Sequence, residues 1–281
     1  MTPKTFKSDN ARITAYLDGP MHHGATCATV GNFAFKSPDA GAEILGQAIA
    51  HIRENGIRQI IGPMDGDTWH SYRIVTQTDS SPAFLLEPGH LPGAVDIFKA
   101  AGFTTISRYF SARASLADAA KIKPDPTDNF RIERWDGNDP QALFDQVYDL
   151  STQAFARNMF YKPISRAAFL DIYMPMVPML KPELIFFARR PDGSLAGFLF
   201  GTPDYAQGPK PTSVILKTYA SLERGAGQHL AFAFHTAAAA QGYETAIHAL
   251  IHDDNQSAAR SASEGADIFR RYDLFGLTLD G

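Results

Sequence analysis

Residues 217–230 read Lys-Thr-Tyr-Ala-Ser-Leu-Glu-Arg-Gly-Ala-Gly-Gln-His-Leu, a pattern that predicts a strand passing through a glycine-rich turn into a helix. Glycine has no Cβ atom, so a ligand can approach the backbone of such a turn closely. The N-terminus of the helix adds N–H groups without helical partners and the positive end of the helix dipole. This combination favours a phosphate or pyrophosphate at residues 224–228.

Two well-known phosphate motifs do not fit this stretch. A P-loop would continue with Gly-Lys-Ser/Thr, and a dinucleotide-binding turn would have a third glycine where Leu230 stands. An ordinary glycine-rich connection between a strand and a helix is the alternative to a phosphate site.

The residues around the turn predict an α/β (α+β) fold with a mixed sheet. The spacing of apolar residues predicts helices at 140–155, 166–173, 225–241 and 255–269, and strands at 184–189, 195–201, 213–220, 244–251 and 274–279. The turn Arg190-Pro-Asp-Gly-Ser194 joins two of these strands as a hairpin.

The N-terminal part of the chain repeats this order of elements. Strands are expected at 26–35, 57–62 and 103–112, and helices at 39–55 and 91–101. Gly41 and Gly56 precede Gly227 and Gly242 by the same 186 residues (227 − 41 and 242 − 56), so two helices align without a gap. The repeat predicts two similar domains in tandem.

Residues 117–128 separate the two parts. They combine two prolines with alternating charges and offer little to bury, which is typical of a linker. We therefore expect domains at residues 1–116 and 129–281.

Composition narrows the class of protein. The 281 residues are 44% hydrophobic and carry a net charge of −4, which is ordinary for a soluble globular protein and argues against a nucleic-acid partner. Cys27, the only cysteine, excludes an intramolecular disulfide and is expected to be buried and inert. With neither a signal peptide nor a membrane-spanning run in the sequence, we expect a cytoplasmic protein without a membrane partner. The oligomeric state is not indicated.

The strand, the Arg-Gly-Ala-Gly turn, the alanine-rich helix and a strand ending at Asp253-Asp254-Asn255 resemble the acyl-CoA-binding part of the GNAT (GCN5-related N-acetyltransferase) superfamily. The likeness extends over residues 26–279, and the loop at 61–72 resembles one in tandem bacterial members. In the N-terminal copy Asp39 stands where the phosphate would lie, so this copy is expected to be truncated or degenerate. The resemblance implies that acetyl-CoA, or another acyl-CoA, is the co-substrate. The residues it assigns to the pyrophosphate are Arg224, Gly225, Ala226, Gly227 and Gln228, and Asn255 is assigned to the pantetheine.

The implied activity is transfer of an acetyl or other acyl group to an amine of a small molecule or peptide by direct attack. Such a transfer needs a base for the amine and a proton donor for the leaving thiolate. Tyr219 and Glu223 flank the turn and are the catalytic candidates. The chain departs from the family at Leu222, where Gln or Arg is usual, and at Ala262, near which the family commonly has a tyrosine acid.

These departures keep two alternatives open. One is a catalytically inactive ligand-binding protein with the GNAT fold. The other is an aminoacyl-tRNA-dependent transferase, against which the negative net charge argues.

The candidate acceptor-binding residues are mostly aromatic, a type suited to binding flat or apolar groups. They are Trp69, His70, Tyr72 and Tyr161. The first three could line an acceptor pocket between the halves or seal a packed loop. Residues 159–179 are either a lid over the acceptor or packed helices. Neither His22-His23 nor His252-Asp253-Asp254 has convincing metal-ligand spacing, so we expect no metal.

Overall fold

The computed structural model describes residues 2–126 and 129–279, which form two compact units. Unit 1 comprises residues up to Tyr109, the segment Asn158–Lys162 and the residues from Arg270 onward. Unit 2 comprises Phe110–Arg157 and Pro163–Phe269. A linear division of the sequence puts residues 270–279 in the C-terminal domain, whereas the contacts put them in unit 1. The reason is that the last strand pairs with strands of the N-terminal part.

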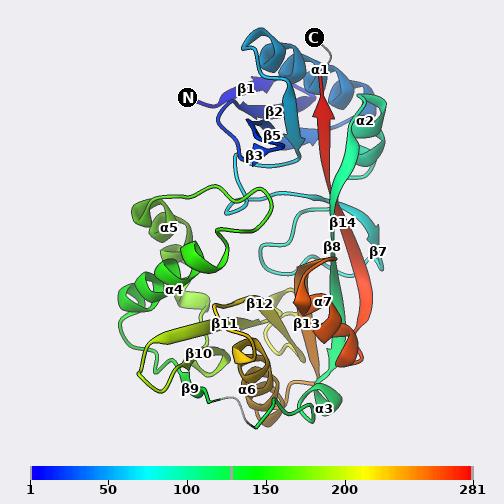
Figure 1. The fold of residues 1–281 in the computed structure, drawn as a ribbon. Helices are drawn as coiled ribbons and strands as arrows, with labels where there is room; N and C mark the ends of the chain where they lie inside the picture. The colour runs from blue at the N-terminus through cyan, green and yellow to red at the C-terminus, as the bar shows by residue number, and fades with distance from the viewer. Residues whose placement is uncertain (1, 127–128, 280–281) are drawn as a thin grey trace. The chain divides into compact units, whose positions relative to one another are not determined.

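Unit 1 contains a sheet with strand order β1-β2-β5-β6-β14, on which β7 also pairs with β14. Strands β5 and β6 are parallel, whereas the pairs β1–β2, β2–β5, β6–β14 and β7–β14 are antiparallel. Figure 1 shows α1 and α2 side by side against this sheet. The elements of unit 1 are β1 (Lys4–Lys7), β2 (Ala11–Tyr16), β3 (Met21–His22), β4 (Ala25–Thr26), β5 (Ala28–Phe35), α1 (Pro38–Glu54), β6 (Gln59–Gly62), β7 (Ile74–Thr78), α2 (Ala94–Ala100), the first part of β8 (Thr104–Ser115) and most of β14 (Asp267–Thr278).

Helix α1 begins, ends and packs as its sequence dictates. The Ser37 side chain accepts a hydrogen bond from the Ala40 N–H and so caps the helix, and Gly56 ends it with a φ of 76°. Residues at helical spacing, such as Ile44, Leu45 and Ile52, are buried in the core of unit 1. The predicted helix at 39–55 is therefore confirmed.

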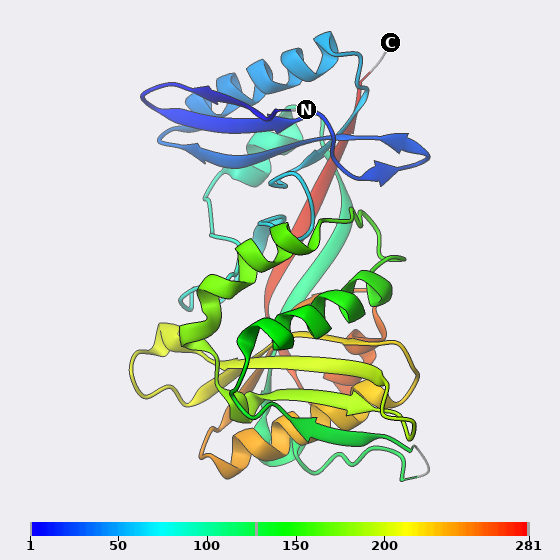
Figure 2. The same cartoon turned by 90° about the vertical axis from the view of Figure 1, so that its left-hand side faces the viewer.

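Unit 2 contains the strand order β8-β13-β12-β11-β10-β9, in which β12 and β13 are parallel. Figure 2 shows α4 and α6 on opposite faces of the strands β10 to β12. The predicted hairpin around residues 190–194 is confirmed as the turn between β10 and β11. The elements are α3 (Leu116–Ala119), β9 (Arg131–Arg134), α4 (Pro140–Ala154), α5 (Arg166–Tyr173), the 3-10 helices η1 (Met174–Met179), η2 (Pro182–Leu184) and η3 (Tyr205–Gln207), β10 (Ile185–Arg189), β11 (Leu195–Pro203), β12 (Ser213–Ser221), α6 (Ala226–Ala240), β13 (Thr245–His252) and α7 (Gln256–Ser263).

Both units contain the same strand–helix–strand arrangement. The parallel pairing begins at Ala28 and Ile60 in unit 1 and at Ser213 and Thr245 in unit 2. The partners are 32 residues apart in each case (60 − 28 and 245 − 213). The internal repeat expected from the glycine spacing thus corresponds to a repeated fold.

The predicted helix at 255–269 is wrong in its second half. Helix α7 ends at Ser263, Gly265 adopts a φ of 68°, and β14 begins at Asp267. A left-handed glycine ends a helix readily, and the residues that follow it extend into the long strand. The last strand is accordingly longer than the expected 274–279.

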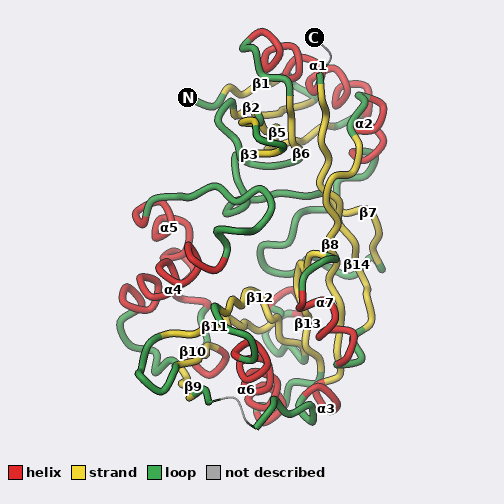
Figure 3. Tube along the Cα trace, in the orientation of Figure 1, coloured by secondary structure: helices red, strands yellow, loops and turns green. Residues whose placement is uncertain are grey.

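Several strands were not expected from the sequence. Among them are β1, β2, β7 and β9. The expected linker at 117–128 begins with helix α3, whose Leu116 and Ala119 are buried. Residues 127 and 128 of that linker lie outside the described part of the chain. Residues 79–93 contain no helix or strand, as Figure 3 shows.

Among residues 2–126 and 129–279, no helix has both the length and the apolar character needed to cross a lipid bilayer.

Candidate functional site

The parallel strands β12 and β13 separate partway along their length. Their pairing runs from Ser213 with Thr245 to Leu216 with His248 and stops there, although both strands continue. Beyond this point β12 still pairs with β11, while Leu250 of β13 has a φ of 57° and its N–H donates to Ser111 Oγ at 3.0 Å. Beyond Leu216 and His248, the described residues of β12 and β13 form no ladder with each other, an arrangement in which an extended ligand can pair with strand backbone.

The glycine-rich turn ends at the N-terminus of α6. Gly225 is the N-cap residue with a φ of 91° and a ψ of −43°, a conformation that favours glycine. Within the described residues no side chain caps this helix, in contrast to α1. The positive end of the helix dipole at Ala226 and Gly227 is thus available to an anion.

Gly227 lies against two polar side chains. A Cβ atom added there would stand 3.0 Å from Arg260 Nη1 and 3.2 Å from Tyr219 Cε2. Arg260 Nη1 also donates to the Tyr219 hydroxyl oxygen at 3.4 Å. Burial raises the pKa of Tyr219, and the nearby Arg260 guanidinium only partly offsets this, so the phenol is a neutral proton donor at ordinary pH. Arg260 was not predicted as a site residue, because α7 brings it to the turn from a different part of the chain.

The equivalent position in unit 1 is filled by apolar side chains. A Cβ atom on Gly41 would meet Ile97 Cδ1 at 2.7 Å and the Phe35 ring at 3.0 Å. Ser37 already caps α1, and Asp39 lies in its first turn. This N-terminus is therefore unsuited to an anion, in agreement with the expectation of a degenerate copy.

Glu223 and Arg224 lie on the exposed side of the turn. Glu223 forms an ion pair with Arg190, and its side chain is 42% exposed. Both residues line a surface depression of about 580 Å³, together with Asn129, Phe130, Arg190, Pro191 and Asp192. The ion pair makes the Glu223 carboxylate less available as a base. Gln228, the last of the predicted pyrophosphate residues, is exposed on the first turn of α6.

Asn255 is the N-cap of α7. Its Oδ1 accepts a hydrogen bond from the Ser257 N–H at 3.2 Å, which leaves the side-chain NH₂ group as a donor. The nearby Ala262, where the resembled family commonly has a tyrosine, is exposed on the same helix.

Three of the four predicted acceptor residues come together in unit 1. Trp69 Nε1 donates to the Lys162 carbonyl at 2.8 Å, and the Trp69 and Tyr161 rings make an edge contact with centroids 6.1 Å apart. His70 Nδ1 lies 2.8 Å from Asp67 Oδ1, which also accepts from the Trp69 and His70 N–H groups. The Asp67 hydrogen bond raises the pKa of His70. These side chains form a polar-aromatic group contributed by the loop after β6 and by the segment Asn158–Lys162.

Tyr72 is not part of this group. Its ring stacks on the Arg73 guanidinium at 3.9 Å, and the same guanidinium lies 4.1 Å from the Tyr109 ring. Of the segment 159–179, Tyr161 contacts Trp69, whereas Phe169 and Tyr173 pack with Phe144 inside unit 2.

No family model matches this sequence, and no curated protein matches it. The fold, by contrast, matches several solved structures over nearly the whole chain. A GCN5-related N-acetyltransferase from Sphaerobacter thermophilus is 12% identical with a TM-score of 0.56, covering 97% of this chain and 78% of that one. A tandem GNAT protein from the clavulanic acid biosynthesis pathway is 14% identical with a TM-score of 0.55, covering 98% and 82%. A conserved Enterococcus faecalis V583 protein of unknown function, described as a probable N-acyltransferase, is 10% identical with a TM-score of 0.62, covering 96% and 59%. At such identities the likeness concerns the fold alone.

Proposed function

We propose that this chain, which has the fold of the tandem GNAT proteins, transfers an acyl group from acyl-CoA to an amine. The observation that carries the proposal is the separation of β12 from β13 beyond Leu216 and His248, directly before the uncapped N-terminus of α6. A long ligand with an anionic part and an amide-containing arm fits these two features together, and coenzyme A is such a ligand.

The anionic part of the ligand would lie at residues 224–228. The dipole of α6 and the Arg260 guanidinium both favour negative charge there, and Gly227 has no Cβ atom to block its approach. The amides of the arm would pair with the backbone of β12 between Lys217 and Ser221. The side-chain NH₂ group of Asn255, three residues after the end of β13, can donate to the same arm. Acetyl-CoA would supply the acyl group as a thioester.

Tyr219 is the proposed proton donor. It belongs to the separated half of β12, and burial keeps its hydroxyl protonated. A neutral phenol can give its proton to the sulfur atom that leaves when the amine attacks the thioester carbonyl. Glu223 stays a candidate for the base, although its ion pair with Arg190 must open first.

The acceptor amine is assigned to the group formed by Trp69, His70 and Tyr161. The two rings offer flat apolar surfaces, and the Asp67–His70 pair offers a hydrogen-bonding and titratable edge. This combination suits a small molecule or peptide that has an amine next to an apolar or aromatic part.

Isothermal calorimetry with acetyl-CoA, coenzyme A and free pantetheine tests the cofactor site. We expect acetyl-CoA and coenzyme A to bind one per chain, and pantetheine, which lacks the pyrophosphate, to bind more weakly. Absence of acetyl-CoA binding at millimolar concentration would refute the proposal.

A thiol-release assay with a panel of small amines and of peptides that have free amino groups tests the reaction. Amine-dependent release of coenzyme A is the expected result. Because Ala262 stands where the resembled family commonly has its tyrosine acid, a ligand-binding protein without activity is the second candidate. Tight acetyl-CoA binding with no turnover across the panel would favour it.

A further inference from the structure

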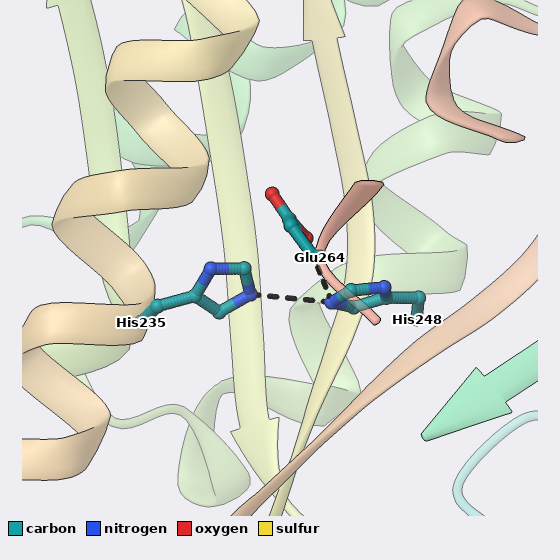
Figure 4. A group of neighbouring side chains, drawn as sticks. All are labelled: His235, His248 and Glu264. Carbon is teal, nitrogen blue, oxygen red and sulfur yellow. Dashed lines mark hydrogen bonds and ion pairs between the residues drawn. The ribbon is translucent and has the colours of Figure 1, made fainter. Parts of the chain in front are cut away.

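Three ionisable side chains meet inside unit 2 at a place that the proposed transfer reaction does not use. His235 comes from α6, His248 from β13 and Glu264 from the end of α7. Their exposed fractions are 0%, 3% and 7%, so all three are buried. Figure 4 shows both imidazole rings and the carboxylate directed toward one another.

The distances between their ligand atoms suit one shared metal ion. His235 Nε2 lies 3.2 Å from His248 Nε2, which lies 3.4 Å from Glu264 Oε2, and the three residues' ligand atoms all lie within 4.8 Å of one another. In a tetrahedral zinc site, bonds of about 2.0–2.2 Å place neighbouring ligand atoms about 3.3 Å apart. Two histidines and one glutamate form a ligand set that zinc commonly takes.

The surroundings of His248 also fit a ligating role. Its Nδ1 lies 2.9 Å from Ser261 Oγ, and when Nδ1 carries the proton and donates it to this hydroxyl, Nε2 has the lone pair that a metal ion needs. Metal-bound histidines nearly always use their second ring nitrogen in this way.

A cluster held by protons alone is the competing explanation. Two neutral imidazoles and a carboxyl group can share protons, but His235 Nε2 and Glu264 Oε2 then both face the single Nε2 atom of His248. A single divalent ion would satisfy the three facing atoms at once. The charge of Arg260 opposes such an ion, so we expect a small anion such as hydroxide or chloride as the fourth ligand.

We propose that His235, His248 and Glu264 bind one Zn²⁺ ion that ties α6, β13 and α7 together. These elements also carry the proposed cofactor residues Gly227, Arg260 and Asn255. Because the cluster is buried, the ion stabilises the fold and takes no direct part in acyl transfer.

The test uses the full chain without an affinity tag, stripped of metal with a chelator and then titrated with Zn²⁺ against a chromophoric competitor. We expect one Zn²⁺ per chain and a higher thermal unfolding temperature. Co²⁺ in place of Zn²⁺ should give the strong visible absorption of a tetrahedral site. A folded wild-type protein that binds no Zn²⁺, or whose Co²⁺ complex lacks this absorption, would overturn the proposal.

Variants locate the ion. Ser261→Ala removes only the hydrogen-bond partner of His248 and should weaken Zn²⁺ binding roughly 10–100-fold. Glu264→Gln keeps the shape of the side chain but removes its charge, and should weaken Zn²⁺ binding at least as much. His252→Gln changes another histidine of β13 that is outside the cluster, and should leave Zn²⁺ affinity unchanged. Equal Zn²⁺ affinity in wild type, Glu264→Gln and Ser261→Ala would place the ion elsewhere and contradict the assignment. If Glu264→Gln does not fold, Ser261→Ala and the wild-type Co²⁺ spectrum still decide the matter.

Discussion

Arg260 Nη1 lies 3.0 Å from the position that a Cβ atom on residue 227 would occupy. A cationic side chain from α7 is thereby held beside the N-terminus of α6, which no side chain caps within the described residues. The helix dipole and the guanidinium both favour an anion at the same place. This relationship underlies the first prediction.

Gly227→Ala should weaken acetyl-CoA binding by about 10-fold or more, equivalent to about 1.4 kcal/mol. The added methyl group occupies the approach to the backbone and displaces Arg260. The free energy of unfolding should change by less than about 1 kcal/mol, because the better helix propensity of alanine offsets the crowding. Calorimetry and urea denaturation measure the two quantities.

Gly46→Ala is the matched control for this substitution. Gly46 is exposed in α1 and has no heavy atom within 4 Å of an added Cβ. The Gly46→Ala substitution should leave the affinity for acetyl-CoA unchanged. If Gly227→Ala also leaves this affinity unchanged, no anion binds at the N-terminus of α6.

Gly225→Ala should behave differently from Gly227→Ala. Gly225 has a φ of 91°, a region that a residue with a Cβ atom enters at a cost of about 1–2 kcal/mol or more. We expect a lower free energy of unfolding by that amount in urea denaturation. A variant as stable as wild type would mean that the turn adopts another conformation in solution.

Tyr219→Phe should lower kcat about 100-fold if the hydroxyl donates the proton to the leaving sulfur. KM for acetyl-CoA should stay within about threefold, because the ring and its packing remain. Steady-state kinetics with an accepted amine measures both. A parallel rise in KM with unchanged kcat would instead assign Tyr219 to binding.

Asp67→Asn should lower the pKa of His70 toward the ordinary value of about 6.5. The hydrogen bond to Asp67 raises that pKa, so the contribution of the protonated pair to stability is present below pH about 6.5 and is lost as pH rises through the raised pKa. NMR titration of the His70 ring measures the change. Asp65→Asn should have a smaller effect, since Asp65 acts on His70 only through space; equal effects of the two variants would contradict the hydrogen-bond explanation.

Cys27 should be unreactive in the folded protein. It is fully buried, and burial raises the pKa of its thiol to about 11. Reaction with a thiol reagent at pH 8 should be at least about 100-fold slower than in denaturant, because little thiolate forms and the site must open first. Rapid modification of native protein would indicate that β4 and β5 open readily.

Local patterns were sufficient for most elements of the fold and for the turn at 224–228. Helices α1, α4 and α6 follow from apolar spacing, and the hairpin between β10 and β11 follows from its Pro-Asp-Gly turn. The short strands β1, β2 and β9 have weaker patterns, and their pairing partners determine them.

The candidate site could be predicted only in part, because some of its residues come from segments far apart in the chain. Residues of one continuous turn appear together in the sequence, so Arg224 to Gln228 could be proposed as a phosphate site from the sequence. Arg260, which lies beside the proposed anion site, stands four residues before Glu264 and about one helical turn from it, but no spacing links either residue to α6.

The sequence by itself thus determined the two-fold repeat and the glycine-rich turn before α6, because each depends on neighbouring residues and backbone preferences. Only the tertiary structure decided that β14 returns to unit 1, that Arg260 stands beside Gly227, and that His235, His248 and Glu264 converge. These outcomes depend on pairing and packing between segments far apart in the chain, where no local spacing records which side chains will meet.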